Sequence, residues 1–307
     1  MLNKKEFLKR AIDSNAFVST DSEATAVNPN IWDYKLREYE EKFLVVTPLG
    51  EQFDFRSPGV DWKVTVDDAP SAAAALTETV DVPISAFSTR NVTFTPTEYG
   101  AAYQLTRKEA VRAFFSVAER MVKKLAYAMA DKKDQLAIAA IRGGATNTDV
   151  YVNSKTTTTD IASTDTIDYS SILLAAREIE DNYYTAKNVV IAPKQKQNIL
   201  DLSTVNKVNE FGDRMALERG LIGDLFGLKI YISNNITVET TATTSYYRIL
   251  VMGESQTGEQ AFGYAIKRDP IIEKEYHARG RYWDIVGHEE YNFQVLHPGA
   301  LTIIYSA

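Results

Sequence analysis

The chain has 307 residues, with 41 acidic and 34 basic side chains and a formal net charge of −7. It has no cysteine, which excludes disulfides and every Cys-dependent mechanism, and its three histidines all lie in the last tenth of the chain, which disfavours most metalloenzymes. No apolar run approaches the ~20 residues of a membrane helix and the N-terminus lacks a signal-peptide stretch, so we expect a soluble cytoplasmic protein without a membrane partner.

Residues 1–50 indicate an arm rather than a domain. Lys4–Ile12 and Asn30–Lys42 could each form a short helix, and a polar stretch without periodicity joins them. The second helix would present one apolar stripe, made of Trp32, Leu36, Tyr39 and Phe43. Two such helices bury little surface by themselves, so we expect the arm to lie against something else.

Residues 51–105 have three basic and eight acidic side chains and an alternating pattern typical of strands. The predicted strands are Trp62–Val66, Val80–Ile84 and Val92–Phe94. The first two would pair as a long antiparallel hairpin, and the small, acidic residues between them predict an exposed loop tip. Because such a hairpin is marginal when isolated, it too is expected to rest on a partner.

Asp67 and Asp68 raise the question of paired carboxylates for acid–base chemistry. They lie at the predicted loop tip, where nothing would exclude water or shift a pKa. We therefore interpret the pair as part of a turn.

A long helix is the clearest predicted element. Thr106 and Glu109 form a capping box, and an apolar stripe then runs without glycine or proline to Gly143-Gly144. At 1.5 Å per residue, one continuous helix would be about 50 Å long. Such a helix spans a protein as a strut.

The same helix is the basic region of an acidic chain, with nine basic and four acidic side chains in residues 106–142. One interpretation is an inner surface that neutralises phosphates without reading sequence. That surface would include Arg112, Lys123, Lys124, Lys132 and Lys133. The sequence favours the other interpretation, a solvated helix face that balances acidic neighbours.

Residues 145–166 predict a polar loop with one short strand at Val150–Val152, and an α/β unit follows at about 167–253. Its predicted helices are Tyr169–Tyr184, Pro193–Leu202 and Phe211–Gly220, and its strands are Asn188–Ala192, Leu228–Ser233 and Tyr246–Met252. From Ala261 onward the chain returns to strands: AFGYAI, IIEKEYHA, RYWDIVG, YNFQVL and ALTIIY.

No motif of a catalytic, cofactor or metal site is present. The chain has no phosphate-binding glycine loop, nucleophile elbow or zinc-protease motif. Glu289 and Glu290, beside His288, would lie on opposite faces of a strand, so we interpret them as solvated surface. We predict no catalytic residue, no cofactor and no metal, and therefore no enzyme.

The order of these parts resembles the major capsid proteins of tailed bacterial and archaeal viruses, whose fold is named after phage HK97. The segments that carry the resemblance are Tyr103–Glu109 leading into the long helix, Val189–Pro193, Ile222–Asn235 and the aromatic strands between Tyr276 and Tyr305. The resemblance implies an α+β fold. It assigns residues 1–50 to an N-terminal arm, 51–105 to an extended loop, 106–166 to a peripheral domain with its spine helix, 167–253 to an axial domain and 254–307 to strands that close the peripheral sheet.

The resemblance also implies a function: pentamers and hexamers that form an icosahedral shell around double-stranded DNA, in the virion after a stage in the host cytoplasm. Intersubunit contacts would involve Trp32, Tyr39, Trp62, Lys63, Asp67 and Asp68. Portal protein and separate scaffold or decoration proteins would be partners, since we expect no built-in scaffolding segment. Although Lys63 lies where some relatives form crosslinks, no motif names a partner for it, and we expect none.

Two alternatives stay open at this stage. An encapsulin, which is a cellular compartment of the same fold, would hold cargo enzymes instead of DNA. A stand-alone β-rich enzyme or carbohydrate-binding protein would be monomeric even at high concentration.

Overall fold

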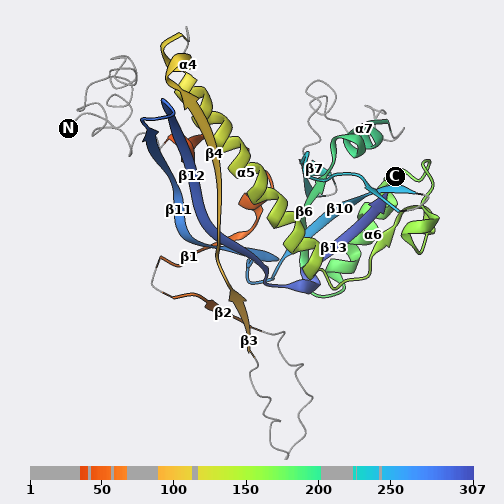
Figure 1. Cartoon of the computed structure of the whole chain (residues 1–307). Helices are drawn as coiled ribbons and strands as arrows, with labels where there is room; N and C mark the ends of the chain where they lie inside the picture. The colour runs from red at the N-terminus through yellow and green to blue at the C-terminus, as the bar shows by residue number, and fades with distance from the viewer. Residues whose placement is uncertain are drawn as a thin grey trace, which may run out of the picture.

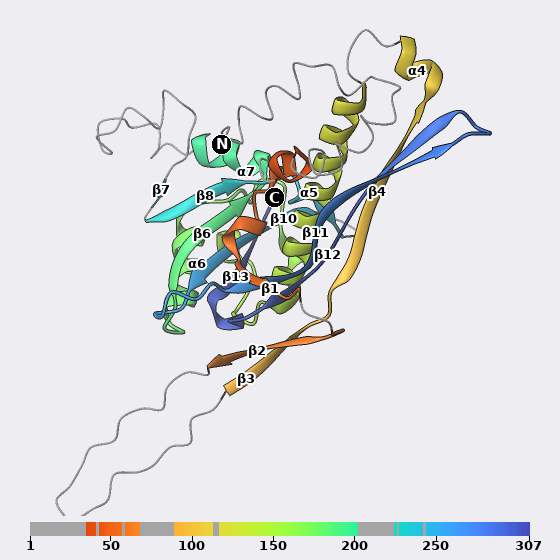
Figure 2. The same cartoon turned by 90° about the vertical axis from the view of Figure 1, so that its left-hand side faces the viewer.

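The computed structural model describes residues 35–40, 43–56, 59–67, 89–112, 117–201, 224–225, 227–241 and 244–307. Several predicted features lie outside these residues: Lys4–Ile12, Trp32, Asp68, Val80–Ile84 and Phe211–Gly220. Within the described ranges, two sheets flank a long helix, α5 (Val117–Gly144), as Figures 1 and 2 show.

The first sheet has four strands in the order β1-β11-β12-β4. Its strands are β1 (Glu51–Asp54), β11 (Phe262–His277), β12 (Tyr282–Val295) and β4 (Thr97–Thr106). β11 and β12 form a long antiparallel hairpin, so four of the predicted closing strands are in fact two. The pairing is irregular between Ile266 and Ile271, around Pro270, because proline cannot donate to a strand ladder.

The predicted capping box at Thr106 is confirmed. Glu109 Oε2 accepts the Thr106 N–H at 3.2 Å, and Thr106 Oγ1 accepts the Glu109 N–H at 3.3 Å. It opens a short helix, α4 (Arg107–Arg112), while the main helix is α5 (Val117–Gly144). Residues 113–116, which join the two helices, lie outside the described residues, so the single continuous helix stays a prediction. α5 has 28 residues, about 42 Å at the usual rise, and ends at the predicted glycine pair.

The second sheet has seven strands in the order β5-β13-β10-β6-β8-β7, with β9 paired to β10. The strands are β5 (Val150–Tyr151), β6 (Thr185–Ile191), β7 (Asp224–Leu225), β8 (Leu228–Ile232), β9 (Glu239–Thr240), β10 (Ser245–Glu254) and β13 (Leu301–Ser306). β6 and β8 run parallel, and the helices α6 (Tyr169–Glu180) and α7 (Pro193–Asp201) accompany β6 in the chain. The predicted order of α6, β6, α7, β8 and β10 and the proline start of α7 are confirmed, while the sheet also includes β5 and β13 from outside residues 167–253.

Helix α6 is shorter than predicted. It begins at a capping box made by Asp168 and Ser171 and ends at Glu180, four residues before the expected end at Tyr184. Tyr183 has a φ of 66°, which a continuing helix does not allow. The turn at Tyr183 leads directly into β6.

The closing strands divide between the two sheets. β11 and β12 belong to the first sheet, whereas β13 pairs with β10 and β5 in the second. The sequence had suggested that residues 254–307 complete a single sheet, but their strands belong to two sheets. All six residues of β13 are buried, since both α5 and α6 contact this strand. One core runs between the two sheets and includes Ile141 of α5, Leu250 of β10 and Phe262 of β11.

A two-stranded ribbon projects away from both sheets (Figure 1). It consists of β2 (Trp62–Asp67) and β3 (Thr89–Phe94), with Trp62 opposite Phe94 and Asp67 opposite Thr89. The predicted strand at Trp62–Val66 is confirmed. Its partner in the described part of the chain is β3, whereas we had expected Val80–Ile84.

Candidate interaction surfaces

The base of the ribbon is fixed to the body by an aromatic cluster. Phe94 is fully buried and packs with Ala265 of β11 and with Leu296, which directly follows β12. Trp62 stacks on Phe55 with ring centres 5.4 Å apart, and the ammonium group of Lys267 lies 5.6 Å from the Trp62 ring centre. Trp62, predicted as an intersubunit contact, is therefore half-covered by its own chain.

The outer face of the ribbon has no such cover. Along β2, Val66 is buried, whereas Lys63, Thr65 and Asp67 alternate with it and are exposed. This alternation follows the strand period of two. Lys63 and Asp67 are thus placed where another molecule can reach them.

The segment of residues 35–40 is helical and packs on α5. Leu36 is fully buried in a cluster with Val122 and Leu125 of α5. Tyr39 also lies on its own chain, because its hydroxyl donates to Glu119 at 3.5 Å and its ring centre is 5.9 Å from the Lys123 ammonium. The part of the predicted apolar stripe that the structure describes rests on α5.

α5 has one buried face and one charged face. Val122, Leu125, Ala126 and Met129 are buried on the side that contacts β12 and β4. Lys123, Lys124 and Lys132 are exposed on the other side. The side chain of Arg112 lies outside the description.

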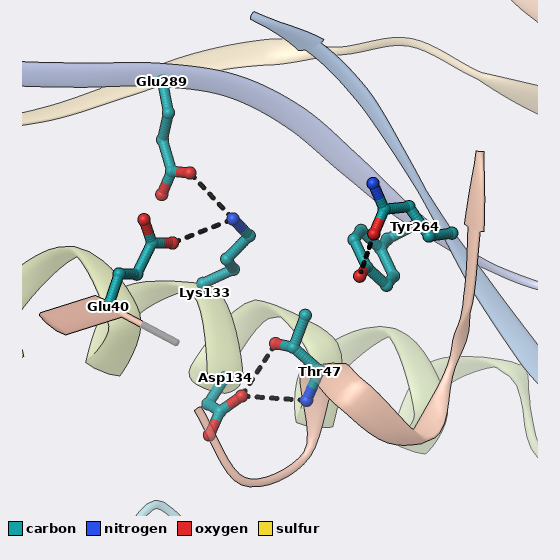
Figure 3. Close-up of polar contacts among 7 residues, drawn as sticks. Glu40, Thr47, Lys133, Asp134, Tyr264 and Glu289 are labelled. Atoms are coloured by element: carbon teal, nitrogen blue, oxygen red, sulfur yellow. Dashed lines mark hydrogen bonds and ion pairs between the residues drawn. The ribbon is translucent and has the colours of Figure 1, made fainter. Parts of the chain in front are cut away.

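Lys133 requires a correction, because it is not part of any exposed basic surface. Its ammonium group donates to Glu40 at 2.9 Å and to Glu289 at 2.8 Å (Figure 3). The side chains of Lys133, Glu40 and Glu289 are 6%, 4% and 2% exposed. We had also expected Glu289 to be solvated surface. It is buried instead, because it lies on the side of β12 that faces α5.

The environment shifts the pKa values of this triad. Burial alone would lower the pKa of Lys133, but the two carboxylates outweigh it and raise that pKa above its ordinary value. Burial raises the pKa of Glu289 to about 8, and the Glu40 carboxyl adds to the rise, against the lowering effect of Lys133. One oxygen of Glu289, Oε1, is buried without a hydrogen-bond partner.

Asp134, the neighbour of Lys133, holds the next part of the chain. Its carboxylate accepts the backbone N–H of Val45 at 2.7 Å, the N–H of Thr47 at 2.9 Å and the Thr47 hydroxyl at 2.7 Å. Two consecutive residues of α5 therefore fix both ends of residues 40–47, as Figure 3 shows.

The triad is enclosed between α5 and β12, and no described cluster of three or more His, Asp or Glu side chains could hold a metal ion. No helix in the described ranges is long and apolar enough to cross a bilayer. The roles of Glu40 and Asp134 were not predicted from the sequence. The spacing of Lys133 after Val122, Leu125 and Met129 is a signal of a buried position, although we had expected Lys133 on an exposed basic face.

Known proteins match both the sequence and the fold. A family model described as phage capsid protein matches residues 90–281. The capsid structure of cyanophage P-SCSP1u is 17% identical over 84% of this chain and 86% of that chain, with a TM-score of 0.65. The capsid of Ralstonia phage GP4 is 11% identical over 84% and 87%, with a TM-score of 0.63.

A virus-like particle from Pyrococcus furiosus has the same fold, with 11% identity over 90% of this chain and 98% of that chain and a TM-score of 0.55. No curated protein sequence matches the chain. Identities this low show a shared fold alone. Membership of the family is shown by the family model that matches residues 90–281.

Proposed function

The chain belongs to the phage capsid protein family and is a major capsid protein with the HK97-like fold, and from this premise we propose that its copies build the icosahedral shell of a tailed virus around double-stranded DNA. The observation that carries the proposal is the family match over residues 90–281, which includes α5, the strands β4 and β11 of the first sheet and every strand of the second sheet except β13. The family disfavours the encapsulin and stand-alone alternatives.

We propose that the shell is held by the elements that the sequence predicted to need a partner. The ribbon supports this role, because Lys63 and Asp67 are exposed on a two-stranded element that projects from the body. Trp32 and Asp68 are proposed contacts on the same sequence grounds, and Tyr39 and Trp62 would contribute only the part of their surface that their own chain leaves open. Closed symmetry multiplies many weak contacts into a stable shell.

The segment assignments are proposals of the same kind. Residues 1–50 would be the arm, 51–105 the extended loop, 106–166 the peripheral domain with α5 as its spine, 167–253 the axial domain that meets the symmetry axes in pentamers and hexamers, and 254–307 the remaining strands. The division of β11, β12 and β13 between two sheets ties the last segment to both domains.

We further propose that the exposed lysines of α5 face the packaged DNA. Lys123, Lys124 and Lys132 would neutralise DNA phosphates without recognising a base sequence. Such non-specific contacts suit a chain whose net charge is −7, because this charge disfavours a dedicated DNA binder. In this function the chain has no enzymatic activity and acts with a portal protein and with separate scaffold or decoration proteins. It would be made in the host cytoplasm and end in the virion.

Negative-stain electron microscopy of the purified chain, with size-exclusion chromatography and the 260/280 nm absorbance ratio, tests the proposal. Closed shells with subunits in pentamers and hexamers are expected. Nucleic acid inside supports a viral shell, whereas shells that take up only a protein cargo support the compartment. A chain that stays monomeric at high concentration, with crowding agents and with its scaffold protein, contradicts the proposal.

A further inference from the structure

The triad of Glu40, Lys133 and Glu289 has an unbalanced charge. Two carboxylates surround one ammonium group, and all three side chains are almost completely buried. With both carboxylates ionised, the cluster would bury a net charge of −1, which is costly away from water. One proton shared by the two carboxylates would make the cluster neutral. Figure 3 shows both carboxyl groups turned toward the same ammonium group and toward each other.

In the described part of the chain, the titratable groups that act on the triad or on Tyr291 beside it carry no positive charge. They are Asp134 of α5, Tyr99 of β4, Tyr264 of β11 and Tyr291 of β12. The Asp134 carboxylate is already occupied by the backbone of Val45 and Thr47, and it adds negative charge. Burial, and then the charge of Glu289, raises the pKa of the Tyr291 hydroxyl, so this group stays neutral beside the triad.

The triad joins three parts of the chain. Glu40 is the last described residue of the helical segment 35–40, Lys133 lies on α5, and Glu289 lies on β12. The contact between Glu40 and Lys133 therefore ties the first described segment of the chain to α5.

We propose that Glu40, Lys133 and Glu289 form a proton-linked latch, which holds residues 35–40 on α5 and β12 firmly when the two carboxylates share a proton and weakly when they do not. The direction follows from linkage. The closed latch keeps a proton on Glu289 up to a pKa of about 8, whereas a solvated glutamate loses it near 4.5. Opening therefore releases a proton between these values, and the latch weakens as pH rises through this window and changes no further above it.

Hydrogen exchange of the full-length chain, followed by mass spectrometry between pH 5.5 and 9, tests the latch. The measured quantity is the protection factor of residues 35–40, the intrinsic exchange rate at each pH divided by the observed rate. We expect it to fall by about tenfold or more between pH 5.5 and 8 and to level off above pH 8. Glu289→Gln, which mimics the protonated carboxyl, should hold the protection factor constant within about twofold.

Two further variants complete the test. Glu40→Gln removes the other carboxylate from the segment itself and should also abolish the pH dependence, even if Glu289→Gln does not fold. Glu290→Gln is the matched control, because Glu290 is the next residue of β12 and pairs with Lys267 instead. The histidines and the ion pair of Lys35 with Glu119 remain in every variant. A flat wild-type profile, or a decrease that persists in both Glu289→Gln and Glu40→Gln, overturns the proposal.

Discussion

At the scale of single residues, buried carboxylates carry much of the specificity of this fold. Asp134 accepts hydrogen bonds from three consecutive backbone N–H groups, those of Val45, Val46 and Thr47, and from the Thr47 hydroxyl. A carboxylate with this many donors anchors the bend at Val45 and Val46 and the start of the 3-10 helix Thr47–Leu49. Its neighbour in the chain, Lys133, holds the helical segment 35–40 through Glu40. The two residues therefore hold consecutive parts of the chain on α5.

Asp134→Ala should therefore destabilise the unassembled chain by about 2–4 kcal/mol, because it leaves buried N–H groups without an acceptor. The free energy of unfolding in urea measures the effect. Asp131→Ala is the matched control, since Asp131 lies one turn earlier on α5 and its carboxylate accepts only from Gln135 in the described contacts. Its expected cost is about 0.5 kcal/mol or less. Equal losses in the two variants would show that the loop does not depend on Asp134.

The triad shows how far residue roles could be predicted. The spacing of Lys133 on the buried stripe of α5 was visible in the sequence, but a lysine on such a stripe has no partner until the fold supplies one. Glu40 and Glu289 are 93 and 156 residues away from Lys133. No local pattern encodes so distant a pairing, and Glu289 therefore read as one of many surface acids.

At the scale of elements, α5 and β12 approach each other closely at a glycine. A Cβ atom at Gly287 would lie 2.7 Å from Leu125 Cδ2 and 3.1 Å from Met129 Sδ. Only a residue without a side chain lets the helix lie this near the strand.

Gly287→Ala should push α5 away from β12 and cost about 1–3 kcal/mol of stability. Thermal unfolding of the unassembled chain measures the loss. In Gly143→Ala, by contrast, the new Cβ meets nothing within 4 Å, and the better helix propensity of alanine should leave the chain as stable or slightly more stable. If Gly287→Ala melts at the wild-type temperature, the close approach is not a constraint on the interface.

The charged face of α5 leads to a second element-scale prediction. Replacing Lys123, Lys124 and Lys132 with glutamine should leave shell formation intact but lower the salt concentration at which DNA leaves opened shells, because fewer phosphate contacts remain. In a matched variant, three lysines elsewhere in the chain are changed to glutamine: Lys194 and Lys196 of α7 and Lys229 of β8. Equal shifts in the two variants would mean that α5 has no special role in contacting DNA.

Secondary structure was predictable where local signals agree. The capping box at Thr106, the proline start of α7 and the glycine end of α5 all act within a few residues, and all three are confirmed. The single strand β11 was predicted as two because Pro270 interrupts the alternation, although the hairpin with β12 continues past the irregularity. Local breaks in a pattern are weaker than a long antiparallel partner.

At the scale of the whole molecule, the order of parts predicted the fold better than any single motif. The partition of the closing strands was not predictable, because β13 reads like β11 and β12 in sequence and differs only in the strands beside it. Its neighbours β10 and β5 are chosen by long-range packing. The ribbon is the second feature at this scale. It projects from the body, and its outer face is exposed in the described part of the chain.

Shortening the ribbon tests its proposed role in assembly. Because Asp67 and Thr89 lie directly opposite each other, residues 68–88 can be replaced by Asn-Gly, a pair that closes a two-residue hairpin turn. The contacts that anchor the ribbon stay intact: Trp62 stacks on Phe55, and Phe94 packs against Ala265 of the first sheet. The unfolding temperature should therefore change by less than about 3 °C. Electron microscopy should then show folded subunits but no closed shells.

A chain in which residues 68–88 are replaced by a glycine-serine linker of the same length separates reach from side-chain contacts. Loss of shells in both variants indicates that specific side chains of this segment bind a neighbouring subunit. Shells from the linker variant alone indicate that length suffices and that Lys63 and Asp67 on β2 make the contacts. Normal shells from the shortened chain would remove the ribbon from the assembly interface, and the contacts would then have to lie on the arm and on the two sheets.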